Sequence, residues 1–126
     1  MCEYCLIAEV DTFYGCEVDH VISLKHGGSS EPENLAYACA PCNRAKGTEI
    51  ASISASGELT RFFNPRTDRW AEHFRLEGAS IQRLTTIGEV TARILGCNDS
   101  ARLHERDEMI RFGKYPSEAA ARTLMS

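Results

Sequence analysis

Four of the six cysteines stand in two Cys-x-x-Cys pairs, Cys2/Cys5 and Cys39/Cys42. Two thiolates three positions apart can hold one face of a metal ion, and two such pairs complete the tetrahedral sulfur set that Zn²⁺ prefers. A redox dithiol motif usually occurs singly in a βαβ setting, and a disulfide framework accompanies a secretory signal. The spacing therefore predicts one structural zinc ion. Cys16 and Cys97 lack a partner at ligand spacing and are interpreted as ordinary thiols.

The segment between the two pairs is expected to form a small ββα unit. Residues 17–22 alternate polar and apolar side chains and predict a strand, residues 25–30 form a loop, and residues 34–39 predict a second short strand. Pro41 suits the first turn of a helix that is expected over residues 43–49, although Gly47 weakens its end. A unit of this size has little core of its own, so a zinc clip at both ends would hold it together.

These residues resemble a known family in order and spacing. The series Glu17-x-Asp19-His20, Gly27-Gly28, Asn34-Leu35 and Cys39-x-x-Cys42-Asn43-x-x-Lys46 resembles an HNH endonuclease of the ββα-metal fold, of the small stand-alone bacterial type. The resemblance extends from residue 2 to about residue 48. It implies that His20 is the general base, that Asp19 and Asn43 hold a catalytic divalent metal, and that Asn34 is the middle Asn of the pattern. Asn43 stands where the family name expects His, and such variants occur within the family.

The chemistry of these side chains agrees with the roles that the resemblance implies. Hydrolysis of a phosphodiester needs a positioned water, stabilisation of the phosphoryl oxygens and help for the leaving 3′ oxygen. A neutral imidazole at His20 suits the first task, and one hard cation on few protein ligands can serve the other two. The side-chain oxygen of Asn43 suits Mg²⁺ or Mn²⁺ better than Zn²⁺. Asn34 is expected to bond loop backbone, so that a loop carbonyl can orient the imidazole.

The neighbouring positions of Asp19 and His20 raise a geometric objection. Successive side chains on a strand point to opposite faces, so a bulge within residues 16–19 is expected to bring both groups to one site. Glu17 suits a supporting or solvated position better than that of a ligand. Basic side chains close to this site are candidate phosphate contacts, namely Lys25, His26, Arg44 and Lys46.

The overall charge does not match a generic nucleic-acid-binding domain. The chain carries 14 basic and 18 acidic residues, a formal net charge of −4. Residues 61–83, by contrast, hold five arginines against three acidic residues, so binding to a polyanion must be local and helped by bound cations. The longest apolar run, residues 35–40, is far shorter than the roughly 20 residues of a membrane span. The first residues show neither a basic nor an apolar signal region, so a cytoplasmic location is expected.

Residues 51–126 are expected to form an α/β extension that packs on the core of residues 1–50 as one compact unit. Residues 52–57 are interpreted as a short exposed segment, followed by a strand over 57–63 and a helix over 68–74 in which Trp70 and Phe74 share a face. Residues 74–84 predict a hairpin around Gly78-Ala79.

Two further helices are expected in the extension. The first runs from a capping box of Thr86 and Glu89 to Leu95, and the second runs from a cap at residue 99 or 100 to Phe112. The last ten residues are expected to fray. His73 and His104 belong to no constellation of polar residues and are interpreted as structural.

The stretch 63–74 also resembles an extension found on small stand-alone bacterial HNH proteins. Within it, Arg66 and Arg69 are candidate DNA contacts. The competing interpretation is that both arginines only pair with Asp68 and Glu72 on a solvated face.

The sequence as a whole favours an α+β fold and a metal-dependent DNA endonuclease. Few side chains are available to read base edges, so we expect low sequence specificity on double-stranded DNA. One active site cuts one strand per visit, so a monomer or weak dimer is expected to nick. The alternative is a non-catalytic, zinc-ribbon-like module that binds nucleic acid or protein. Such a module needs the four cysteines alone, whereas the Asp19-His20 pair with Asn34 and Asn43 favours the enzyme.

Overall fold

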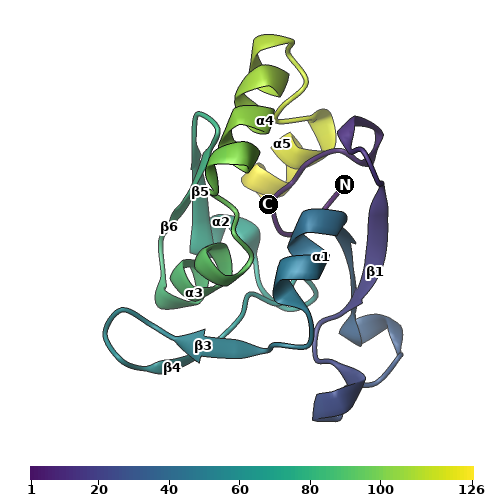
Figure 1. Cartoon of the computed structure of the whole chain (residues 1–126), viewed down its shortest axis with the longest axis vertical. Helices are drawn as coiled ribbons and strands as arrows, with labels where there is room; N and C mark the ends of the chain where they lie inside the picture. The colour runs from purple at the N-terminus through teal and green to yellow at the C-terminus, as the bar shows by residue number, and fades with distance from the viewer.

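The N-terminal part of the fold is a hairpin closed by a helix. The structure, a computed structural model, describes residues 1–126 and pairs β1 (Cys16–His20) with β2 (Leu35–Cys39), which leads directly into α1 (Ala40–Lys46) (Figure 1). The predicted ββα unit is therefore present. Its helix begins and ends earlier than the predicted 43–49, because Pro41 occupies the first turn and Gly47 adopts a positive φ of 54° at the C-terminal end.

The β1–β2 ladder is regular from end to end. Its residues pair in continuous register from Cys16 opposite Cys39 to His20 opposite Leu35. The bulge expected within residues 16–19 is absent, so that expectation was wrong. Asp19 and His20 consequently keep the alternation of an ordinary strand, and Asp19 is buried while Val18 is exposed.

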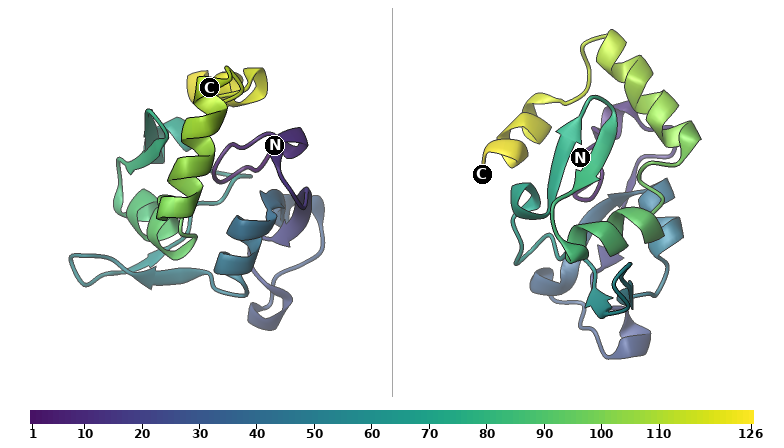
Figure 2. Two further views of the ribbon diagram at one scale, coloured as in Figure 1. Left: turned by 45° about the horizontal axis from the view of Figure 1, so that its top comes forward. Right: turned by 90° about the vertical axis from the view of Figure 1, so that its left-hand side faces the viewer.

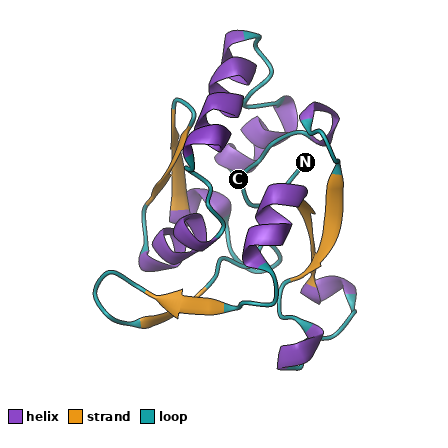
Figure 3. Cartoon of the chain, viewed as in Figure 1, coloured by secondary structure: helices purple, strands orange, loops and turns teal.

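The rest of the chain adds two more hairpins and four helices. In chain order these are β3 (Ala51–Ile53), β4 (Leu59–Arg61), α2 (Trp70–His73), β5 (Phe74–Glu77), β6 (Ser80–Arg83), α3 (Thr86–Ile94), α4 (Ser100–Arg111) and α5 (Glu118–Met125). Each sheet has only two antiparallel strands, and the three sheets lie apart from one another (Figure 3). The β3–β4 hairpin extends outward from the body, and α4 and α5 lie at the opposite end from the loop between β1 and β2 (Figure 2).

Three details of the extension differ from the expectations. Ala51–Ile53 forms a strand paired with β4, although residues 52–57 were expected only as an exposed segment. The cap of α3 is Thr85, whose hydroxyl accepts from the Gly88 amide, so the predicted capping box of Thr86 and Glu89 does not form, and Glu89 accepts from the Ala55 amide instead. The last ten residues contain α5, which Ser117 caps and whose Ala120 is fully buried, rather than a frayed end.

One cluster of buried side chains draws on both halves of the chain. The helix expected over residues 68–74 is shorter, and Phe74 begins β5 instead, yet the rings of Trp70 and Phe74 still pack with centroids 4.9 Å apart. Phe63 lies edge-on to Tyr4 and to Phe74, and Val90 of α3 is fully buried in the same cluster. The N-terminal cysteine loop is therefore covered by aromatic side chains of the extension. No helix in the structure has the length and apolar character that crossing a bilayer would require.

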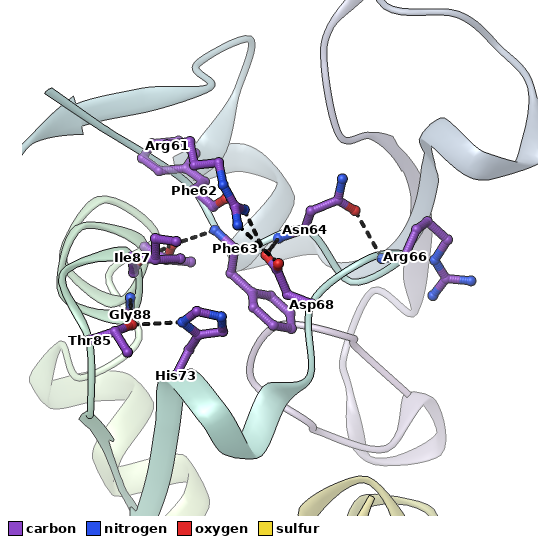
Figure 4. A network of polar contacts seen from close by, with 11 residues as sticks. Arg61, Phe62, Phe63, Asn64, Arg66, Asp68, His73, Thr85, Ile87 and Gly88 are labelled. Carbon is purple, nitrogen blue, oxygen red and sulfur yellow. Dashed lines mark hydrogen bonds and ion pairs between the residues drawn. The ribbon is translucent and has the colours of Figure 1, made fainter.

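A polar network fixes the segment that leads from β4 to α2 (Figure 4). The carboxylate of Asp68 accepts two hydrogen bonds from Arg61, at 2.7 and 3.0 Å, and one from the Asn64 amide at 2.8 Å. The Phe63 amide donates to the Thr91 hydroxyl of α3, and His73 contacts the Thr85 hydroxyl. The Arg61 guanidinium lowers the pKa of Asp68 below its usual value, because it stabilises the charged carboxylate.

The substitution Asp68→Asn should therefore lower the free energy of unfolding by about 1 kcal/mol, since it weakens charged hydrogen bonds that are partly open to solvent. A lowered pKa in the folded state stabilises the fold above the unfolded pKa, and the effect disappears only as the pH falls through the folded pKa. Urea titrations at pH 5 to 8 should thus give a constant difference from the wild type. Glu72→Gln, at an exposed pair, is the control. A difference that vanishes by about pH 6 would contradict this account.

Candidate active site and metal centre

The four cysteines of the two pairs form one buried cluster. Their sulfur atoms all lie within 4.8 Å of one another, and each residue is at most 2% exposed. No disulfide links them. Four thiol sulfurs at this spacing are the donor set of a closed tetrahedral zinc site, so the residues fit a structural Zn²⁺ ion. The cluster thus bears out the predicted metal site, whereas Cys16 and Cys97 lie outside the set of four.

A tight loop brings the first pair into position. The Cys2 amide donates to the Ile7 carbonyl at 2.8 Å, and the Leu6 amide donates to the Cys2 carbonyl at 3.0 Å. Leu6 adopts a φ of +66°, an uncommon conformation for a residue with a branched side chain, and is completely buried. The loop docks on β2, because the backbone of Glu3 and its carboxylate both bond the backbone of Tyr37. β2 itself ends at Cys39, which places the second pair beside the first.

The carboxylate of Asp19 is buried and held from two sides. Asp19 is 3% exposed, and its Oδ2 accepts a hydrogen bond of 2.8 Å from the Tyr4 hydroxyl. Its Oδ1 lies 3.1 Å from Nζ of Lys46, which also donates to the His20 carbonyl at 2.9 Å. Burial, together with the Asp19 charge, raises the pKa of Tyr4, so the hydroxyl stays protonated and remains a donor.

This arrangement corrects one expectation about DNA contacts. Lys46 was expected as an exposed phosphate contact, but it is 1% exposed and its ammonium group is enclosed by Asp19 and the end of β1. A buried carboxylate requires a nearby cation, and Lys46, on the buried face of α1, supplies it.

His20 and Asn34 meet the loop between β1 and β2 in different ways. Nε2 of His20 lies 3.1 Å from the Ser30 hydroxyl, a side-chain contact rather than the loop carbonyl that was expected. Asn34 makes three hydrogen bonds to backbone: it accepts from the Ile22 amide and donates to the carbonyls of Ile22 and Ser29. The loop also requires Gly28, because a Cβ atom there would lie 1.7 Å from the Ile22 carbonyl oxygen.

One surface cavity brings the candidate catalytic residues together. It has a volume of about 300 Å³, and its lining includes Asp19, His20, Asn43 and Lys25. Asp19 and His20 are successive residues of β1, but the strand ends at His20, and both residues line the cavity. Nδ2 of Asn43 donates to Glu17 at 3.1 Å, which leaves Oδ1 of Asn43 without a protein donor. Asn34 is not part of the lining; its bonds reach the loop behind His20.

The other predicted DNA contacts are on the surface. Lys25, His26 and Arg44 are exposed. Arg69 pairs with Glu72 at 3.1 Å, the pairing that the solvated-face interpretation anticipated. Arg66 pairs with Glu3 instead of Asp68, which is bound by Arg61.

Sequence reasoning missed three side chains that touch the site. The position of Tyr4 inside the first cysteine pair was one indirect signal. No local sequence pattern, however, links Tyr4 to Asp19, fifteen residues away. Ser30 gave none beyond its membership of a polar loop. Arg102, sixty residues from Cys42, donates to the sulfur of that cysteine, and no local pattern could have identified it.

Comparison with known proteins gives one family match, which covers part of the chain. The family model of the HNH endonucleases matches residues 2–49, the segment that contains all four cysteines and the cavity residues named above. A search of curated proteins and a search of solved structures found no match.

The substitution Cys39→Ser should abolish zinc binding and unfold the cysteine loop and the β1–β2 hairpin, because metal binding and folding are linked in small zinc sites. Zinc content by elemental analysis and circular dichroism measure the two effects. Cys16→Ser is the matched control: Cys16 lies outside the cluster, so this variant should retain zinc. A zinc-free Cys39→Ser protein that remains folded would show that the four cysteines do not form a structural site.

A double substitution separates the charge of Asp19 from its packing. Lys46→Met alone should destabilise the protein by about 3–5 kcal/mol, because it leaves a buried carboxylate without its cation. Adding Asp19→Asn removes that charge, so the double variant should be more stable in urea than Lys46→Met alone. Equal or lower stability of the double variant would mean that the buried pair does not act through charge.

Proposed function

Because the family model of the HNH endonucleases matches residues 2–49, we propose that the protein is a metal-dependent endonuclease that hydrolyses phosphodiester bonds of double-stranded DNA. The family supports a nuclease-type activity. The observation that carries the proposal for this chain is the cavity in which Asp19, His20 and Asn43 meet. A module that only bound nucleic acid would need the zinc site and no such set of polar groups.

His20 is the proposed general base. The Ser30 hydroxyl engages Nε2 of the ring, which leaves Nδ1 to take a proton from the attacking water. Asn34 supports this role from outside the cavity: its three bonds to the backbone of Ile22 and Ser29 hold the loop that carries Ser30. The ring is therefore fixed before substrate arrives, which a general base requires.

Asp19 and Asn43 would hold the catalytic ion, Mg²⁺ or Mn²⁺. Their oxygens fit such a cation, since Oδ1 of Asn43 has no donor and the Asp19 carboxylate, with two hydrogen bonds accepted, retains free lone pairs. When bound, the ion would supply Lewis-acid stabilisation of the phosphoryl and leaving 3′ oxygens. Lys46 fixes the orientation of Asp19 and at the same time binds the His20 carbonyl, so one side chain sets the spacing of ligand and base.

Phosphate contacts are proposed for the exposed basic side chains near the cavity. Lys25 is part of its lining, and His26 and Arg44 are exposed nearby in sequence. Arg66 and Arg69 would extend the contact along the extension; each now forms a partly exposed ion pair, and such pairs are weak enough to exchange for phosphate. The chain has few side chains for base readout. We therefore propose nicking with low sequence specificity by a monomer or weak dimer.

The deciding experiment is incubation of supercoiled plasmid with the protein and Mg²⁺ or Mn²⁺, beside an EDTA control. Nicked circles should form only with metal, and His20→Ala should slow their formation by at least about 100-fold, the usual contribution of a general base. His104→Ala is the matched control, because His104 is exposed on α4 and lies outside the cavity lining.

Three results would oppose the proposal. Plasmid that stays intact with every metal would favour the zinc-ribbon-like binding module, and gel shifts would then measure DNA binding. Retained cleavage by His20→Ala would remove His20 as the base. Linear product at the earliest times would replace the nicking monomer with a dimer that cuts both strands.

A further inference from the structure

The extension places one arginine directly against the zinc-binding sulfurs. Arg102 lies in α4, and its guanidinium donates to Sγ of Cys42 at 2.9 Å and to Sγ of Cys39 at 3.7 Å. The opposite side of the same guanidinium donates to the Leu95 carbonyl at 2.7 Å. Both terminal nitrogens of the guanidinium are therefore hydrogen-bonded. Arg102 reaches two of the four sulfurs from outside the segment that the family model matches.

The charge of the zinc site explains why a cation is needed there. Four thiolates on one Zn²⁺ leave two negative charges uncompensated, and the four cysteines are almost completely buried. Burial of uncompensated charge is unfavourable, and hydrogen bonds from a cation to the thiolates offset part of it. The two buried cations are already engaged: Lys46 pairs with Asp19, and Arg106 donates to backbone carbonyls and to Asn98. The half-buried Arg102 is the cation that bonds the sulfurs, in addition to the Cys5 amide, which donates to Sγ of Cys2 at 3.5 Å.

The same side chain lines a cavity beside the cluster. A cavity of about 200 Å³ is lined by Cys5, Cys39 and Arg102, and the exposed rings of Phe13 and Tyr14 form part of its wall. Cys5 and Cys39 therefore lie at the wall of this cavity, although each is at most 2% exposed. A chelator that reached the sulfurs from this side would meet Arg102 beside them.

We propose that Arg102 is a positioning residue of the zinc centre, which retains the metal by donating hydrogen bonds to the Cys42 and Cys39 thiolates. The extension thereby completes a metal site whose ligands all come from the first 42 residues. This role does not depend on the proposed nuclease activity, and it can be tested on the zinc-loaded protein without DNA.

The test compares Arg102→Met and Arg102→Lys with the wild type in two measurements. The first is the rate at which a chromogenic chelator captures zinc from the folded protein, with circular dichroism recorded in parallel. Loss of groups that support a metal ligand typically weakens metal binding by about 10–100-fold, so Arg102→Met should release zinc at least about tenfold faster. Arg102→Lys keeps a positive charge and a hydrogen-bond donor, so its rate of zinc release should lie between those of the wild type and Arg102→Met. Arg111→Met, an exposed arginine of the same helix, is the control and should match the wild type.

The second measurement separates hydrogen bonding from packing. In the Co²⁺-substituted protein, hydrogen bonds to thiolates lower the energy of the sulfur electrons. The sulfur-to-cobalt charge-transfer band of Arg102→Met should therefore move to longer wavelength. A merely structural residue would leave the band in place. The proposal would be overturned if Arg102→Met released zinc at the wild-type rate and left the band unshifted. It would also be overturned if Arg102→Met and Arg102→Lys both released zinc faster while the band stayed in place.

Discussion

The enclosure of four sulfurs within 4.8 Å is the constraint on which the candidate active site depends. A metal at this point would fix three pieces of chain at once: the loop at Cys2–Cys5, the end of β2 and the start of α1. Two of these pieces carry a group that reaches the site. Tyr4, inside the first pair, bonds Asp19, and Asn43 follows Cys42 directly in the middle of α1. A zinc ion bound by the four sulfurs would therefore set the position of the proposed catalytic ligands.

The burial of Asp19 has a consequence for the metal that the site would bind. An exposed carboxylate would attract any cation, whereas Asp19 already shares its charge with Lys46 and a hydrogen bond with Tyr4. The remaining lone pairs are fixed in direction, so the proposed cation would have to fit between Asp19 and Asn43. The ammonium group of Lys46 would repel that cation, so under the proposal the metal would enter more readily together with the phosphate of the substrate than alone.

Local patterns in the sequence predicted the local parts of this structure. The cysteine spacing, the alternation of residues 17–22 and Pro41 before a helix predicted the metal cluster and the ββα unit, because each depends on neighbours in the chain. The predictions failed where distant partners decide. β3 exists because residues 59–61 pair with it, α5 because its buried face packs on the cluster, and Lys46 faces inward because Asp19, twenty-seven residues earlier, needs a cation. The helix cap is Thr85 and not the predicted Thr86, because the sequence pattern does not distinguish which of two adjacent threonines precedes the first helical residue.

The extension is joined to the cysteine loop by more than apolar packing. The indole of Trp70 donates to the Tyr4 carbonyl at 2.8 Å, and the Tyr115 hydroxyl donates to the Cys5 carbonyl at 2.8 Å. Together with Arg102, which donates to Cys42, the extension thus supplies three donors, two to the loop of the first cysteine pair and one to the second pair. Loss of such a donor leaves a buried carbonyl or thiolate without a hydrogen bond, which lowers the free energy of unfolding. The polar groups of the family-matching segment are thus satisfied from outside it, and its geometry is a property of the whole chain.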